Sequence, residues 1–114
     1  MKLQRLDTTS FELLYELNEC CVVGFSRMNC HVCQAVMPAL ETVADKYDGK
    51  VCFFRVDIET DRDLFRRFSL KGVPAILFFK AGEYQGKITG LVDEEQLEQR
   101  IAQLLQISSE ASNV

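Results

Sequence analysis

The chain has 114 residues, a common size for one domain, and its 47% hydrophobic and 26% charged residues exclude an intrinsically disordered protein. A net charge of −4 argues against nucleic-acid binding through a basic surface, and no segment approaches the roughly 20 apolar residues that span a bilayer. The first seven residues lack the apolar core of a secretory signal. We therefore expect a cytoplasmic, monomeric protein without membrane association.

Neither an internal repeat nor a linker rich in proline, glycine or serine divides the chain. We therefore predict one domain over residues 1–107. The polar residues 108–114 are expected to form a flexible C-terminal tail.

The first part of the chain predicts an edge strand, a helix and a buried strand. Lys2–Leu6 is the candidate edge strand. Thr9 and Glu12 have the spacing of a capping box, in which two side chains satisfy free N–H groups at a helix start, and an apolar stripe follows: Phe11, Leu14 and Leu17. The compact apolar run 20–25 predicts a strand that is buried on both faces.

The longest predicted helix follows a turn at residues 26–29, and Asn29 is a suitable N-cap for it. Its apolar residues recur at spacings of three and four: Cys33, Val36, Met37, Leu40, Val43, Ala44 and Tyr47. Pro38 is expected to kink this helix, and Asp48-Gly49 is expected to end it.

The rest of the chain alternates between strands and helices. A buried strand is predicted over 51–58, a short helix over 61–68 and, after the break at Gly72-Val73-Pro74, a third buried strand over 75–80. A hairpin turn at 81–83 leads to a strand at 84–88. Asp93 begins a last helix, whose apolar face is predicted as Leu97, Ile101, Leu104 and Leu105. This alternation predicts an α/β fold in which helices cover both faces of a mixed sheet.

The five cysteines are odd in number and cannot all pair within the chain. Cys30 and Cys33 are separated by two residues at the start of the longest helix, whose N-terminus carries about half a positive charge and favours a thiolate over a thiol. Cys30 is closer to the turn and is the candidate nucleophile. Cys33 lies one turn deeper and can resolve a mixed disulfide. The pattern predicts a thiol–disulfide oxidoreductase.

Structural zinc sites also use cysteine pairs, but they need four ligands. This chain supplies one such pair and a single histidine, His31, which points away from Cys33 on helix geometry. We therefore expect no bound metal. The remaining cysteines, Cys20, Cys21 and Cys52, fall on predicted buried strands and are expected to be core residues without a redox role.

Several segments together resemble the thioredoxin family. They are the strand and turn before Cys30-His31-Val32-Cys33, Pro38 in the helix, Arg55–Glu59, Gly72–Glu83 and Gly90. The resemblance implies a thioredoxin fold with a five-stranded mixed sheet and four helices. It implies a cis Pro74 that faces the cysteines and a Val73 whose backbone binds an extended substrate segment. It also implies protein disulfides as substrates, a thioredoxin-reductase-like electron donor and no cofactor.

Gly24, Asn29, His31-Val32 and Arg55 depart from the usual residues of the family, which are a buried aspartate, a tryptophan, glycine-proline and a lysine. Because these residues around the cysteine pair differ from those of the family, a second hypothesis stays open. In it the protein is a docking module with this fold, and its redox activity is secondary.

His31 and Arg55 are candidate residues for tuning the redox pair. Protonated His31 adds positive charge beside the Cys30 thiolate, which predicts a more oxidising disulfide than is usual for the family, unless His31 is a passive exposed side chain. Arg55 either pairs with Asp57, reaches the cysteines as a fixed cation, or lies at the surface.

Overall fold

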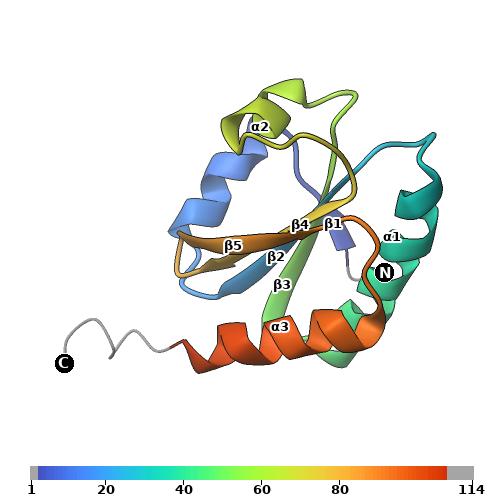
Figure 1. Ribbon diagram of the computed structural model, residues 1–114. Coiled ribbons are helices and arrows are strands. Elements are labelled where there is room, and N and C mark those ends of the chain that lie inside the picture. Colours follow the sequence, from blue (N-terminus) through green and yellow to red (C-terminus); the bar gives the residue numbers. More distant parts are fainter. Residues whose placement is uncertain (1–2, 108–114) are drawn as a thin grey trace.

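The computed structural model describes residues 3–107, and a five-stranded mixed sheet with the strand order β1-β3-β2-β4-β5 forms its centre (Figure 1). The strands are β1 (Leu3–Arg5), β2 (Cys20–Ser26), β3 (Val51–Asp57), β4 (Ala75–Lys80) and β5 (Glu83–Thr89). The helices are η1 (Ser10–Glu16), α1 (His31–Lys46), α2 (Arg62–Arg67) and α3 (Glu94–Gln106). β1 and β2 run parallel to β3, whereas β4 is antiparallel to β2 and to β5. The predicted α/β class, five strands and four helices are confirmed, and the predicted tail at 108–114 lies outside the described residues.

Helices cover both faces of the sheet and create two apolar clusters. α1 and α3 lie against one face, and η1 and α2 lie against the other (Figure 1). Because successive strand residues point to opposite faces, β2 contributes Cys20 and Val22 to the first cluster and Cys21, Val23 and Phe25 to the second. This two-sided burial explains why β2 and β4 are almost continuously apolar in sequence.

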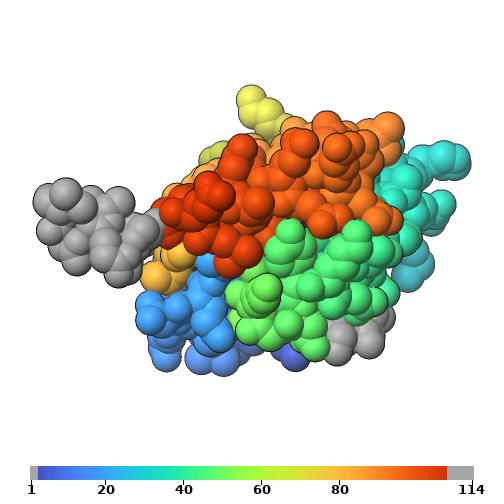
Figure 2. Space-filling model, turned by 90° about the horizontal axis from the view of Figure 1, so that it is seen from below, coloured from blue at the N-terminus to red at the C-terminus, as the bar shows by residue number. Residues whose placement is uncertain are grey.

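α3 lies beside the C-terminal half of α1, as Figure 2 shows from the α3 side. The Lys46 ammonium is 2.9 Å from the Glu98 carboxylate across this contact, and such an exposed pair adds at most about 1 kcal/mol. Asp93 begins α3 as predicted, in a reciprocal capping box with Gln96. Leu105 is 38% exposed, so its predicted place on the apolar face is wrong. Within residues 3–107, no helix is long and apolar enough to cross a membrane.

The first helix forms as a 3₁₀ helix, and its cap differs from the prediction. Thr9 makes no side-chain cap bond. Instead, the Ser10 N–H donates to Asp7 Oδ1 at 2.7 Å, and the Asp7 N–H donates to Ser10 Oγ at 3.0 Å. The capping box predicted for Thr9 and Glu12 is therefore wrong, because a reciprocal pair with the same spacing closes the turn two residues earlier.

The hydrogen bonds from the Ser10 N–H and hydroxyl hold the pKa of Asp7 below its usual value. The ionised carboxylate therefore stabilises the fold above the unfolded-state pKa, and this contribution is lost as the pH falls through the folded-state pKa. We expect Asp7→Asn to lose less stability than the wild type between about pH 5 and pH 2. Urea unfolding across this range measures how the free energy of unfolding of each protein changes with pH. Parallel curves for the two proteins would contradict the role of Asp7.

Asp61 is a buried carboxylate that connects two distant segments, and it is 6% exposed. Its Oδ1 accepts hydrogen bonds from the Thr8 N–H at 3.0 Å and the Thr8 hydroxyl at 3.1 Å. Its Oδ2 accepts from the Thr60 hydroxyl at 3.0 Å and lies 3.5 Å from the Arg5 guanidinium. Asp61 thereby fastens the segment between β1 and η1 to the start of α2.

The hairpin between β4 and β5 has a two-residue turn, Ala81-Gly82, with φ angles of 51° and 82°. Positive φ at both positions is typical of the type I′ turn, which matches the twist of a hairpin. A Cβ at Gly82 would also lie 2.5 Å from the Tyr15 carbonyl oxygen, so glycine allows this close approach. The predicted turn is confirmed, but β5 begins one residue earlier than expected, at Glu83.

Candidate functional site

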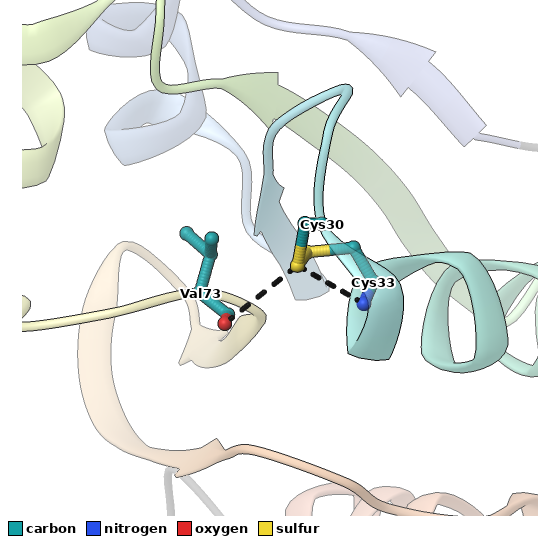
Figure 3. The surroundings of a disulfide bond; sticks show 3 residues. All are labelled: Cys30, Cys33 and Val73. Carbon is teal, nitrogen blue, oxygen red and sulfur yellow. Dashed lines mark hydrogen bonds between the residues drawn. A yellow bond between two sulfur atoms is a disulfide. The ribbon is translucent and has the colours of Figure 1, made fainter.

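Cys30 and Cys33 form a disulfide at the N-terminus of α1, with their Cα atoms 5.2 Å apart (Figure 3). The exposed fractions of the two residues are 8% and 3%. The preceding loop, residues 27–29, is exposed and follows the C-terminal end of β2. The strand, the turn and the helix therefore place the cysteine pair at one end of the sheet, as the sequence predicted.

Cys30, and not Asn29, is the N-cap of α1. Its backbone is extended, with φ −139° and ψ 109°, and its Sγ accepts a hydrogen bond from the Cys33 N–H at 3.1 Å. The prediction for Asn29 is wrong because the chain adopts helical geometry only from His31 onward. If this geometry is kept on reduction, both the hydrogen bond and the helix dipole favour a Cys30 thiolate.

The loop before β4 faces the disulfide. The Val73–Pro74 peptide bond is cis, as the resemblance implied. The Val73 carbonyl oxygen lies 3.9 Å from Cys30 Sγ (Figure 3), and a reduced Cys30 thiol can donate a hydrogen bond over this distance. The Gly90 N–H donates to the Pro74 carbonyl at 3.0 Å and ties the loop to the end of β5. The structure therefore brings Val73 to Cys30, although they are distant in sequence.

Two depressions border the site. One holds about 470 Å³ and is lined by residues 69–74 with Lys87, Thr89 and Gly90. The other holds about 360 Å³ and is lined by Ser26, Arg27, Cys33, Gln34, Met37 and Pro38. Exposed apolar side chains stand in the loops and first helical turn at this end, with exposed fractions of 79% for Met28, 73% for Leu91 and 38% for Val32. The surface around the cysteine pair therefore offers exposed apolar side chains beside polar and basic ones.

Gly24 lies on β2 beneath α1. A Cβ at this position would be 2.8 Å from Leu40 Cδ2 and 3.0 Å from Met37 Cε. The two α1 side chains therefore occupy the space that any larger residue at position 24 would need. Where the family usually has a buried acid, this chain has close apolar packing, and β2 offers no carboxylate there to accept a proton from Cys33.

His31 is exposed as the first residue of α1, so any charge on it is screened by solvent. Arg55 is exposed on β3, where it is the register partner of Gly24. Its side chain makes no ion pair or hydrogen bond with any residue from 3 to 107. The Asp57 carboxylate instead accepts a hydrogen bond from the Glu59 N–H at 2.9 Å. Arg55 therefore lies at the surface, and it neither pairs with Asp57 nor reaches the cysteines.

The other three cysteines carry free thiols. Cys20 and Cys21 are buried, as predicted, with exposed fractions of 5% and 1%. The prediction that Cys52 is a core residue is wrong, because it is half-buried and its thiol donates to Glu19 Oε1 at 3.3 Å. Cys52 is the second residue of β3, and this end of the strand meets Glu19 from the segment before β2. Among residues 3–107, no group of three or more His, Cys, Asp or Glu side chains could hold a metal ion.

The family model for thioredoxin matches residues 2–103. The chain belongs to the thioredoxin family. It is 37% identical over 84 residues to the mitochondrial thioredoxin of Bos taurus, an alignment that covers 74% of the chain and 51% of that protein. It is 28% identical over 94 residues to thioredoxin H4 of Arabidopsis thaliana, covering 82% and 78%. The chain spans about half the length of the mammalian mitochondrial thioredoxins that it matches.

One feature of this thioredoxin-family site was missed by the sequence reasoning, namely that the Cys30 sulfur is itself the helix cap. The signal was present in the spacing. Cys30 precedes Cys33 by three residues, which is the distance from an N-cap to the N3 residue whose N–H it binds. Asparagine is a common N-cap, so the sequence favours Asn29, whereas the geometry of the loop makes Cys30 the cap.

Proposed function

We propose that the chain is a thiol–disulfide oxidoreductase, and the hydrogen bond from the Cys33 N–H to Cys30 Sγ carries this proposal. The Cys30 thiolate bonds to one sulfur of a substrate disulfide, and the other substrate sulfur leaves as a thiolate that takes a proton from water. Cys33 then loses its proton and attacks Cys30, which forms the Cys30–Cys33 disulfide and releases the second substrate sulfur as a thiol. The substrate gains two electrons. A thioredoxin-reductase-like donor then supplies two electrons to the Cys30–Cys33 disulfide and restores the two thiols.

Protein disulfides fit this site as substrates. Val73 lies just before β4, outside the strand pairing, so its backbone groups can bind an extended segment by strand addition. Pro74 holds that segment opposite Cys30, and the exposed side chains of Met28 and Leu91 supply apolar contacts. Arg55 is assigned no step in this reaction.

The activity is tested by the reduction of a disulfide-bonded protein such as insulin, with dithiothreitol as the electron donor. An oxidoreductase accelerates the reduction at catalytic concentrations. A docking module binds the substrate and leaves the rate of the dithiol alone unchanged, and that result would overturn the proposal.

We infer a monomer in a reducing compartment, specifically the cytoplasm. The free thiols of Cys20, Cys21 and Cys52 suit a reducing compartment. The relatives' names include mitochondrial and chloroplastic thioredoxins as well as bacterial ones. Localisation of the tagged chain in its source cells, and light scattering of the purified protein, test these two inferences.

We expect Cys30 to be alkylated first in the reduced native protein. Its sulfur accepts a helix N–H, whereas burial and the adjacent Glu19 carboxylate raise the pKa of Cys52. A brief iodoacetamide pulse at neutral pH, followed by peptide mass spectrometry, measures the order. Earlier labelling at Cys52, which is the more exposed thiol, would reverse the assignment of the nucleophile.

His31→Ala is expected to make the Cys30–Cys33 pair less oxidising. Removing a nearby positive charge destabilises the thiolate of the reduced form. Because His31 is exposed, the shift should be on the order of tens of millivolts. Equilibration of each protein with glutathione measures the two potentials. An unchanged potential would make His31 a passive surface residue.

A further inference from the structure

Cys21 and Cys52 lie opposite each other at the end of the sheet remote from the active site. They are register partners on the parallel strands β2 and β3, and both belong to the apolar face covered by η1 and α2. Cys21 is five residues before the end of β2, which is about 16 Å along the strand. The two thiols are therefore a pair that the reaction at Cys30 and Cys33 does not use.

The spacing of the two residues suits a covalent bond. Neighbouring strands lie about 4.8 Å apart, and disulfides join Cα atoms that are about 4.4 to 6.8 Å apart. Cys20 provides an internal contrast, because it points to the opposite face and its register partner is Val51. Only one of the two adjacent cysteines on β2 can therefore reach Cys52.

The two thiols differ in access. Cys52 is half-buried and lines a cavity of about 190 Å³ with Glu19, Asp48 and Lys50 among its walls. Cys21 is 1% exposed and lies behind it in the apolar cluster. The Cys52 thiol donates to Glu19 Oε1 at 3.3 Å, so a carboxylate lies beside the accessible thiol and orients it. An accessible thiol beside a buried one is the arrangement of an attacking and a resolving cysteine.

We propose that Cys52 and Cys21 form a second dithiol site, which is oxidised by small disulfides that carry no negative charge. Cys52 loses its proton to water, and its Sγ bonds to one sulfur of the small disulfide, whose other sulfur leaves as a thiolate and takes a proton from water. Cys21 then loses its proton in turn and its Sγ attacks Cys52 Sγ, which forms the Cys21–Cys52 disulfide and releases the second small thiol, protonated from water. The protein loses two electrons and two protons, and the small disulfide becomes two thiols.

The adjacent carboxylate sets the charge preference. Glu19 lies in direct contact with the Cys52 thiol, so an anionic disulfide is repelled as it approaches and a cationic one is attracted. Burial raises the pKa of Cys21 to about 12 and also raises that of Cys52, so this pair should react more slowly than Cys30. The Cys21–Cys52 pair thus differs from the Cys30–Cys33 pair in its expected reaction rate and in the charge of the disulfide that it prefers.

The test uses the full chain with Cys30→Ser and Cys33→Ser, so that the active-site pair cannot pass on its disulfide. The folded, reduced protein is treated with cystamine, which is cationic, or with glutathione disulfide, which is anionic. Peptide mass spectrometry then identifies linked cysteines and mixed disulfides. We expect a Cys21–Cys52 link and a reaction about fivefold faster with cystamine. Because this background lacks the catalytic cysteines, the result does not depend on the proposed function.

Three further substitutions assign the roles in the same background. Cys20→Ser should keep the link, since Cys20 faces the other side of the sheet. Cys52→Ser should abolish both link and adduct, and Cys21→Ala should leave a stable cystamine adduct on Cys52. A persistent Cys52 adduct with Cys21 present, or a link that forms only in urea, would overturn the proposal. A reaction at least as fast with glutathione disulfide would overturn the charge preference.

Discussion

Replacing Cys33 with serine is expected to stop turnover and to leave Cys30 covalently joined to its substrate. Cys33 lies in the first turn of α1, bonded to Cys30 in the oxidised state, and so resolves the mixed disulfide within one molecule. Well-oriented intramolecular groups act like reagents at very high concentration, so millimolar external thiol cannot replace Cys33, and we expect a loss on the order of 10³-fold or more. Insulin reduction measures the rate, and non-reducing mass spectrometry detects the trapped adduct.

Two variants complete this experiment. Cys30→Ser should lose turnover without accumulating any adduct, because no nucleophile remains to form one. Cys52→Ser should keep both the turnover and the wild-type adduct pattern, since Cys52 lies at the other end of the sheet. Accumulation of adducts on Cys33 in the Cys30→Ser variant, at the rate seen for Cys33→Ser, would contradict the assigned order of attack.

Gly24→Asp is expected to destabilise the fold by about 4 kcal/mol at neutral pH. The new Cβ would approach Leu40 Cδ2 to 2.8 Å, and the carboxylate would enter the apolar layer between β2 and α1. Part of the cost is overpacking, and the larger part is the burial of a charge without a partner. Arg55, although it is the register partner of Gly24, is exposed and offsets little of it. Urea unfolding measures the change.

Matched variants separate the two contributions. Gly24→Ala adds only the Cβ and should cost about 1 kcal/mol, because the Met37 and Leu40 atoms that it meets are side-chain ends that can shift. Gly24→Asn introduces a side chain of the size of aspartate without its charge, so its loss of stability should fall between those of the other two variants. Equal stabilities for the aspartate and asparagine variants would show that Arg55 or solvent reaches the carboxylate.

The strands and long helices of this fold could be predicted because their signal is local. β2 and β4 are almost continuously apolar, and α1 and α3 carry apolar residues at helical spacing. The start of the first helix could not be predicted as reliably. Asp7 with Ser10, and Thr9 with Glu12, offer equivalent spacings, and only the position of the segment against α2 decides between them.

The residues of the candidate site also fall into two groups, those with a local sequence signal and those whose surroundings are set by packing. Cys30, Cys33, Val73 and Pro74 were found from short motifs, and the structure brings Cys30, Cys33 and Val73 together. Other features of the site depend on which neighbouring elements pack against a residue. Cys52 was expected in the core because β3 is apolar, but it lies near the start of that strand, where its thiol meets Glu19 from another segment. Which α1 side chains fill the space above Gly24 is likewise a result of helix packing that no local pattern encodes.

The buried Asp61 carboxylate has a consequence for how the protein opens in solution. β1 has three residues and α2 has six, and segments this short do not persist alone. Detaching β1 would remove the hydrogen bonds from Thr8 and the ion pair with Arg5, so the Asp61 carboxylate beside α2 would keep only its bond from Thr60. Amide protons of β1 and α2 should therefore exchange with deuterium together, in one cooperative opening, at a higher free energy than either segment could sustain by itself.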